Sequence, residues 1–292
     1  QLKCTICPTG TGKNRDGVIG WGYLKFKNFK KIIDKNPSIK HVELSNYGEI
    51  FLNPELKKII KYGYVKNVGL GAYNGVNLNT VKDDVLECLV KYKFKGMVVS
   101  LDGASDRIYK LYRRGGNFNR VIANIKRINY YKRKYVSEFP ELGWQFVVFG
   151  HNEHELPVAR QMAEELGMRF KVKLNWNPNF SPVKNKEFVR KKSGLNISSE
   201  AEFRQKNNQE YYFCHQLWVT PQINWDGKLL GCCCNNWGDF GNVFKSGLAK
   251  CINSEKYSYA KKMVLGKKKA RKDIPCINCT KWKYFASLKT SL

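Results

Sequence analysis

Hydrophobic positions follow two alternating patterns over the first 174 residues of the chain. Short, almost continuous apolar runs are separated by longer segments in which apolar residues recur at helical spacing. The runs are typical of strands that are buried on both faces, and the longer segments are typical of amphipathic helices. The pattern predicts strands over 41–44, 65–70, 96–101, 144–149 and 170–174.

The segments between these strands have the signals of helices. Asn53 is suited to cap a helix and Pro54 to occupy its first turn. Strands and helices that alternate through short loops form parallel βαβ units in one sheet, whose right-handed crossovers lead to a barrel or an open wound sheet. We therefore expect an α/β fold. The expected helices cover 22–35, a segment from 54 onward, 80–92, 106–135 with a break at Gly115-Gly116, and 153–166.

Polar residues directly follow each of the predicted strands. Parallel sheets bind their ligands at the carboxyl ends of the strands. The sequence therefore predicts a ligand site at that rim, and the loop that contains Cys4 and Cys7 is expected there too. The other rim loops are Ser45–Glu49, Gly71–Gly75, Ser100–Gly103, Gly150–Glu153 and Asn175–Asn177.

The chain changes character after the last of these strands. Residues 177–210 have only weak periodicity and are expected to be a connector, whereas an aromatic-rich segment begins at Tyr211. Asp226-Gly227 is a good hairpin turn, so we expect residues 217–219 and 223–225 to pair, and a helix to follow over 248–265. Several aromatic rings could stack on a base or sugar, although core packing explains most of them. They are Trp218, Trp225, Trp237, Trp282, Tyr284 and Phe285.

Most of the ten cysteines gather at the two ends of the sequence, which favours metal ligation over a disulfide framework. Cys4 and Cys7 form a C-x2-C pair. Near the other end, a C-x12-G-x4-C spacing is followed by a second C-x2-C pair. Four thiolates suit zinc or an iron–sulfur cluster equally well on ligand chemistry alone. The C-terminal set is Cys214, one of Cys232, Cys233 and Cys234, then Cys276 and Cys279, whereas Cys88 and Cys251 are expected in the core.

The formal net charge of +28 raises the question of an anionic partner. Only 12 of the 52 cations are Arg, the residue on which base and phosphate recognition most depends, and the lysines are spread over every segment. Nucleic acid is therefore a possible partner but is not favoured. No apolar run is long enough to cross a bilayer, and the cysteine usage favours a reducing cytoplasm.

The chain as a whole resembles the radical SAM enzymes that carry a C-terminal auxiliary-cluster domain of the SPASM or shortened twitch type. Cys4 and Cys7 match the second and third cysteines of the family's opening C-x3-C-x2-C motif. The other matching stretches are Tyr47-Gly48-Glu49-Ile50, Val99–Ala104, Tyr112–Phe118, Trp225-Asp226-Gly227 and Gly241-Asn242-Val243.

The resemblance implies a partial (β/α)6 TIM-like barrel over residues 1–176, here lacking its first strand. A connector over 177–210 and a small cysteine-rich α+β auxiliary domain over 211–292 would follow. The family's first cysteine would stand just before Gln1, so we expect an N-terminally truncated fragment that is inactive as it stands. Cys279 is the last cysteine, so the C-terminal domain should hold one cluster.

The resemblance also implies cofactors and site residues. Cys4 and Cys7 would hold the 4Fe-4S cluster at which S-adenosylmethionine (SAM) is reductively cleaved to abstract hydrogen from a substrate C–H. Gly48 and Glu49 would bind the ammonium group of SAM, and Arg113 its carboxylate. Ser100 and Asp102 are expected to contact its ribose or carboxylate, with Asn74 and Asn152 as further rim residues. The auxiliary 4Fe-4S cluster would be held by Cys214, Cys232, Cys276 and Cys279.

The resemblance does not decide the substrate. A peptide or a small molecule is the favoured substrate class, and a flavodoxin or ferredoxin is the expected electron donor. Radical modification of a sugar, a nucleotide or an RNA base is the enzymatic alternative. The other alternative is a zinc-stabilised protein that binds nucleic acid without catalysis.

Overall fold

The sheet of the N-terminal unit consists of five parallel strands that follow one another in chain order. The computed structural model describes residues 1–175, 177, 179–199, 201–203, 214–280, 282–283 and 286. The expected parallel α/β architecture is confirmed. The strands are β1 (His41–Glu43), β2 (Gly69–Val76), β3 (Gly96–Ser100), β4 (Glu141–Val148) and β5 (Arg169–Leu174).

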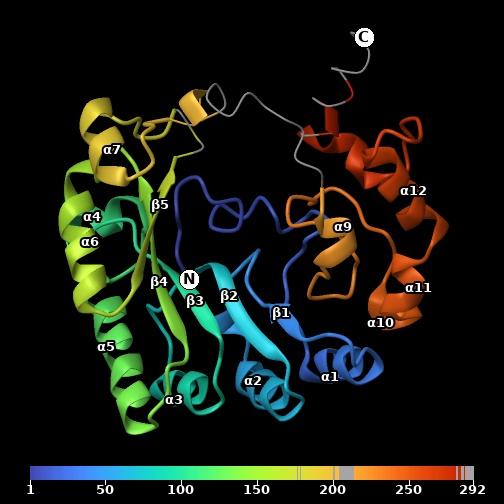
Figure 1. Cartoon of the computed structure of the whole chain (residues 1–292), viewed down its shortest axis with the longest axis horizontal. Coiled ribbons are helices and arrows are strands. Elements are labelled where there is room, and N and C mark those ends of the chain that lie inside the picture. The colour runs from blue at the N-terminus through green and yellow to red at the C-terminus, as the bar shows by residue number, and fades with distance from the viewer. Residues whose placement is uncertain are drawn as a thin grey trace. The chain divides into compact units, whose positions relative to one another are not determined.

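Helices cover the outer face of this sheet and leave the carboxyl ends of the strands to loops (Figure 1). Ser105 and Asn117 each accept a backbone hydrogen bond at the start of a helix, and the break between those helices falls at the predicted Gly115-Gly116. The helices of this unit are α2 (Leu56–Val65), α3 (Asp83–Lys91), α4 (Asp106–Tyr112), α5 (Phe118–Lys134), α6 (Leu156–Glu165) and α7 (Lys186–Ser193), with short 3₁₀ turns at Ile50–Leu52 and Glu153–Glu155.

The two faces of the sheet differ in chemistry because successive side chains of a strand point to opposite sides. On β4, Trp144 and Phe146 are fully buried, and Trp144 lies against Phe118 of α5. The residue between them, Gln145, points to the other face. The helix-facing side therefore carries the apolar core, while polar side chains occur on the inner face.

Several element boundaries differ from the sequence-based expectations. The helix expected from Pro54 begins at Leu56, because the side chain of Asn53 closes a turn on the backbone N–H of Glu55. The strand expected over 65–70 begins at Gly69, since Val65 ends α2. That strand continues through Gly71–Gly75, which was expected to be a rim loop. Residues 177–210 also contain a helix, α7.

The second unit combines Gln209–Leu292 with Gly12–Ser38, a segment that the sequence-based division had placed in the barrel. Trp225 explains this grouping. Its ring fills the space beside Gly22, where a Cβ atom would lie 2.3 Å from it, and its indole N–H donates to the carbonyl of Ile19 at 2.8 Å. The helices of this unit are α1 (Phe26–Lys35), α9 (Gln216–Val219), α10 (Val243–Ser246), α11 (Leu248–Ile252) and α12 (Glu255–Val264).

The expected hairpin of the second unit is only partly correct. The turn does lie at Asp226-Gly227, but the bridged residues are Ile223 and Leu229, and residues 217–219 belong to α9. The expected helix over 248–265 is divided at Ser254, which caps α12. Cys251 is buried in the core of this unit, and Cys88 is buried in α3, as predicted. Tyr211, Tyr284 and Phe285 lie outside the described residues.

Candidate cofactor site at the carboxyl ends of the strands

The loop that contains Cys4 and Cys7 is folded tightly on itself. The backbone N–H of Cys7 donates to the carbonyl of Cys4 at 3.2 Å, and the N–H of Thr11 donates to the carbonyl of Cys7 at 2.9 Å. A Cβ atom at Gly10 would lie 3.0 Å from the backbone of Cys4, so the loop closes this tightly only with glycine there. Cys4 is buried and Cys7 half-buried. The loop therefore presents two thiols beside a shielded surface.

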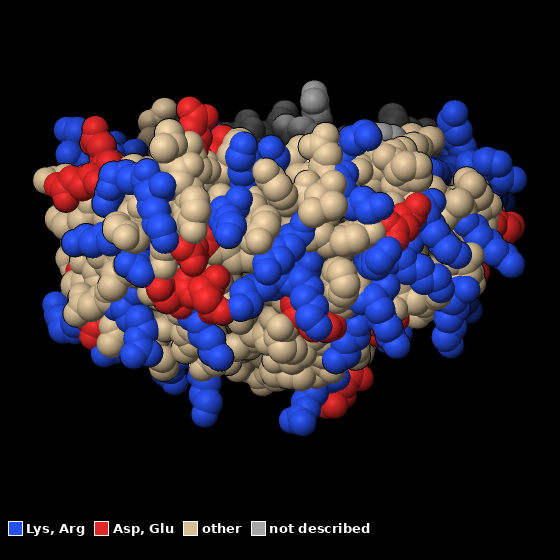
Figure 2. All heavy atoms as spheres, turned by 90° about the horizontal axis from the view of Figure 1, so that it is seen from below, with Lys and Arg blue, Asp and Glu red and all other residues tan. Residues whose placement is uncertain are grey.

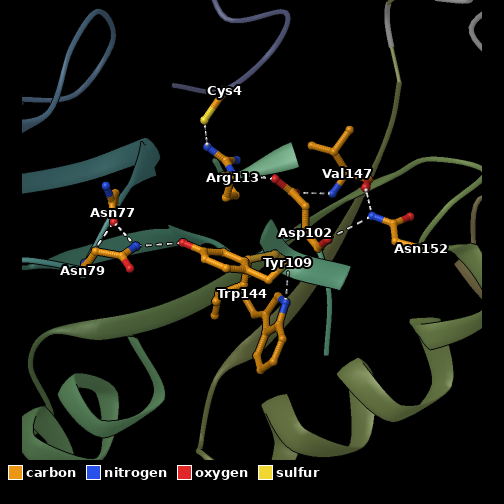
Figure 3. Close-up of polar contacts among 10 residues, drawn as sticks. Cys4, Asn77, Asn79, Asp102, Tyr109, Arg113, Trp144, Val147 and Asn152 are labelled. Atoms are coloured by element: carbon orange, nitrogen blue, oxygen red, sulfur yellow. Dashed lines mark hydrogen bonds and ion pairs between the residues drawn. The ribbon is translucent and has the colours of Figure 1, made fainter. Parts of the chain in front are cut away.

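Arg113 links this cysteine loop to the end of β3 (Figure 3). Its Nε donates to Asp102 Oδ2 at 2.6 Å, and its Nη1 lies 3.7 Å from Cys4 Sγ. Burial raises the pKa of the Cys4 thiol, whereas the Arg113 charge opposes that rise and favours the thiolate. A thiolate is the form that binds iron. The arginine thus favours the charge state that a cluster ligand needs.

Asp102 and Asn152 hold this arginine in place rather than facing a ligand. Both side chains are completely buried. Asp102 Oδ1 accepts from the N–H of Val147 at 2.8 Å, while the Asn152 amide donates to the carbonyls of Asp102 and Val147 (Figure 3). Asn152 Oδ1 in turn accepts from the N–H of Phe149 at 2.7 Å. The structure therefore makes them positioning residues.

Glu49 lies on the loop after β1, where the resemblance expects the acid that binds the SAM ammonium. Its Oε1 accepts from the N–H of Phe51 at 3.1 Å, and its Oε2 accepts from the N–H of Asn77 at 2.7 Å. Burial raises the pKa of Glu49 to about 7, although these hydrogen bonds and Arg113 lower it. A cationic group placed against this carboxylate would offset the cost of burying its charge. Gly48 precedes it at φ +88°, a conformation that favours glycine.

A chain of amides continues from Glu49 into the barrel. Asn77 Oδ1 accepts from the N–H of Asn79 at 2.9 Å, and Asn79 Nδ2 donates to the Tyr109 hydroxyl at 2.8 Å (Figure 3). All three side chains are buried, so the network fixes the segment after β2 and, through Asn77, the Glu49 carboxylate. Sequence reasoning missed this network. The only available signal was the polar Asn77-x-Asn79 pattern that follows an apolar run.

The two remaining predicted site residues, Ser100 and Asn74, lie on different strands of the sheet. Ser100 is buried at the end of β3, and its Oγ lies 2.6 Å from the place where a Cβ atom of Gly75 would be. Asn74 lies in an irregular part of β2, where its N–H donates to Ser45 Oγ and its Nδ2 to the Ser45 carbonyl, each at 3.0 Å. Asn74 thus fixes the loop after β1, and Ser100 lies on the inner face of the sheet.

The four predicted auxiliary cysteines share one neighbourhood in the second unit. The pKa of Cys276 is raised to about 12, first by burial and then by repulsion from Cys232, Cys214 and Cys279. The pKa of Cys232 is likewise raised to about 11 by burial, with Cys214 among the further causes. Of the cysteine triplet, Cys232 is the member whose charge acts on Cys276.

The cysteines approach one another without forming a closed metal site. Within the described ranges, no three His, Cys, Asp or Glu side chains are arranged to hold a metal ion. The donor chemistry nevertheless fits iron–sulfur clusters, because soft thiolates lie in partly buried surroundings in both units. No helix in the described part of the chain is long and apolar enough to cross a membrane.

Comparison with known proteins agrees with this arrangement. Residues 214–280 match the SPASM family, an iron–sulfur cluster-binding domain. The parallel sheet and the SPASM match define the class: the chain has a parallel α/β fold followed by a SPASM iron–sulfur cluster-binding domain. No curated protein matches the sequence.

The solved structures similar to this chain include SuiB of Streptococcus suis. The TM-score is 0.63 at 14% sequence identity, over 89% of this chain and 65% of SuiB. SuiB bound to S-adenosylmethionine gives 0.62 at 15% identity, over 97% of this chain and 68% of that one. SuiB bound to its precursor peptide SuiA gives a TM-score of 0.63 at 15% identity, over 97% of this chain and 67% of that one. The chain thus spans about two thirds of SuiB. At this identity the likeness confirms the fold.

Proposed function

We propose that the protein is a radical SAM enzyme that modifies a peptide, with one auxiliary iron–sulfur cluster in its SPASM domain. The observation that carries the proposal is Arg113, whose largely enclosed side chain joins Asp102 to the sulfur of Cys4. An arginine fixed in this way places a positive charge at a thiol and at the rim where a carboxylate ligand would bind. The SPASM match supports the auxiliary cluster.

The chain's own residues would divide the work of binding. Cys4 and Cys7 would hold the SAM-binding 4Fe-4S cluster. Such a cluster, when bound, supplies the electron for reductive cleavage of SAM and so the means to abstract hydrogen from an unactivated C–H. Glu49, already oriented by the N–H groups of Phe51 and Asn77, would bind the ammonium of SAM. Arg113 would bind the carboxylate of SAM. Gly48, with its positive φ, would let the backbone approach SAM closely.

The second unit would hold the auxiliary cluster through Cys214, Cys232, Cys276 and Cys279. We propose that this cluster relays electrons. A flavodoxin or ferredoxin would supply the first electron, which places the protein in the reducing cytoplasm. The peptide substrate is proposed because the SuiB fold has been solved with a precursor peptide bound.

The test is anaerobic reconstitution of the protein with iron and sulfide. The proposal expects a brown protein that dithionite bleaches and that forms 5′-deoxyadenosine from SAM. The variant Cys4→Ala should abolish deoxyadenosine formation, whereas the matched control Cys88→Ala removes a core thiol of α3 and should retain it. Uptake of zinc alone, without deoxyadenosine, would refute the proposal and favour the zinc-stabilised alternative.

A further inference from the structure

The inner face of the sheet has a polar group on β3, β4 and β5, close to the proposed cofactor site. The strand register places Gln145 of β4 opposite Ser100 of β3 and opposite Lys171 of β5, and it places Lys173 opposite Val147. These side chains share one face, because their neighbours Trp144 and Phe170 point to the helices: Trp144 lies against α5, and Arg160 of α6 lies over the Phe170 ring at 5.0 Å.

Gln145 is the first sign that this face is built to bind something. The side chain is 6% exposed, and its Oε1 has no hydrogen-bond partner in the part of the chain that the structure describes. A buried amide oxygen without a donor has lost its hydrogen bonds to water and gained none in return, so such groups are usually satisfied by a ligand or water. An amide oxygen accepts a hydrogen bond, so its partner would be an N–H or O–H group of a ligand.

Two glycines without side chains lie on this face near the amide. Gly143, two positions earlier on the same face of β4, has no side chain, and its Cβ position lies 3.2 Å from Val98. Gly75 of β2, at φ +107°, brings its backbone close to Ser100 and to Gln145 Nε2, which lies 3.8 Å from its Cβ position. A side chain at Gly75 would collide with Ser100 beside Gln145.

Lys173 supplies the charge. It is half-buried and forms no ion pair with any carboxylate in the described ranges. Asp102, the nearest acid that acts on it, is already engaged by Arg113 and the N–H of Val147. Burial and the neighbouring charge of Lys171 both lower the pKa of Lys173. An anion bound between the two lysines would relieve this repulsion.

We propose that Gln145 and Lys173 form a subsite for an acidic residue of the peptide substrate. The peptide N–H would donate to Gln145 Oε1, and the Lys173 ammonium would bind the carboxylate, with Lys171 beside it. A peptide that carries Asp or Glu supplies both partners, a backbone N–H for Gln145 Oε1 and a carboxylate for the lysines. This inference rests on the proposed function and specifies its substrate.

The test measures binding of two peptides with blocked, uncharged ends, Ac-Ala-Glu-Ala-NH2 and Ac-Ala-Gln-Ala-NH2. Their binding to the reconstituted protein is followed by ligand-observed NMR. The acidic probe should bind at least tenfold more tightly than its amide twin. The variant Lys173→Met should remove this preference, Lys173→Arg should retain most of it, and Gln145→Leu should weaken binding of both probes. The matched control Lys126→Met changes an exposed lysine of α5 and should leave binding unchanged.

Three outcomes would overturn the inference. Equal binding of the two probes would show that no carboxylate is recognised. An unchanged preference in Lys173→Met, with the fold confirmed by circular dichroism, would place the binding elsewhere on the basic surface. Displacement of the acidic probe by SAM would assign the subsite to the cofactor. Deoxyadenosine formation, measured in parallel without peptide, reports the proposed function separately, so each idea can fail while the other holds.

Discussion

At the scale of single residues, burial decides which polar side chains of the rim can meet a ligand. The sequence-based reading placed Ser100, Asp102, Arg113 and Asn152 together at the rim as candidate site residues. In the structure Asp102 and Asn152 are fully enclosed and use their polar atoms on Arg113 and on the backbone. Arg113 is the member whose charge reaches the cysteine loop. The sequence indicated which polar residues lie at the rim. It did not indicate which of them can contact a ligand and which hold another residue in place.

The Asp102–Arg113 pair makes a prediction about stability. Replacing Asp102 with Ala leaves the buried guanidinium without its carboxylate and frees the N–H of Val147. Loss of one partner of a buried ion pair costs about 3–5 kcal/mol in the free energy of unfolding. Urea denaturation measures this loss. The double variant Asp102→Ala/Arg113→Met should recover part of it, and a double variant as unstable as the single one would contradict the ion-pair explanation.

Glu49 makes a prediction about pH. Its pKa is raised from 4.5 to about 7 in the folded protein, mainly by burial. Between these two values the folded chain holds a proton that the unfolded chain has released, so stability should fall as the pH rises through this window. Glu49→Gln should remove this fall, because an amide does not titrate between pH 5 and pH 8, although its NH2 group cannot accept one of the two N–H bonds that the carboxylate accepts.

Denaturant unfolding at pH 5 and pH 8 tests the Glu49 prediction. The control is Glu87→Gln, because Glu87 is an acid of α3 whose pKa is lowered by Tyr135 and Lys134 and whose loss should not stabilise the protein at pH 8. Parallel pH profiles of the parent and Glu49→Gln would contradict the burial of this carboxyl.

At the scale of elements, the loops depend on contacts between segments distant in the chain. Gly150, which follows β4, donates its N–H to the carbonyl of Ser181 at 2.8 Å. This contact brings Phe180 onto Phe149 at 5.4 Å, beside Cys4 and Tyr112. The sequence predicted β4 and a rim loop after it, but nothing local indicated that residues near 180 would close over that loop.

Gly150→Ala should separate these segments. An added Cβ atom would lie 2.0 Å from the carbonyl oxygen of Pro182, which is backbone and cannot move aside cheaply. We expect a loss of about 1–3 kcal/mol in the free energy of unfolding. Proteolysis should also become faster near residues 180–185. Gly167→Ala is a useful comparison, because that glycine has open space but a φ of +66°, so its cost comes from backbone strain alone.

At the scale of the whole molecule, the charge is distributed rather than concentrated. On the face shown in Figure 2, Lys and Arg are spread widely, and Asp and Glu lie among them. Such a surface attracts anions weakly at many places and does not form one nucleic-acid groove on that face. The +28 charge is consistent with an acidic peptide substrate, whose specific recognition we place on the inner face of the sheet.

Cluster binding should follow the division into two units. Cys276→Ser removes a proposed auxiliary ligand from the second unit and should lower the iron content by about four atoms per chain, the content of one 4Fe-4S cluster. The first cluster, bound in the other unit, should still be formed and still cleave SAM. Iron analysis and the deoxyadenosine assay measure both. Cys251→Ser is the matched control, because Cys251 is a core cysteine of the same unit and should leave the iron content unchanged. Loss of both clusters in Cys276→Ser would contradict separate sites.

The sequence by itself determined the parallel α/β order, the positions of the cysteine pairs and the motifs of the rim, because hydrophobic period and ligand spacing are local properties. Only the tertiary structure decided that residues 12–38 join the C-terminal unit, and that Arg113 reaches Cys4. It also decided that Gln145 and Lys173 share the inner face. These facts depend on register and on contacts between distant segments, which no local pattern encodes.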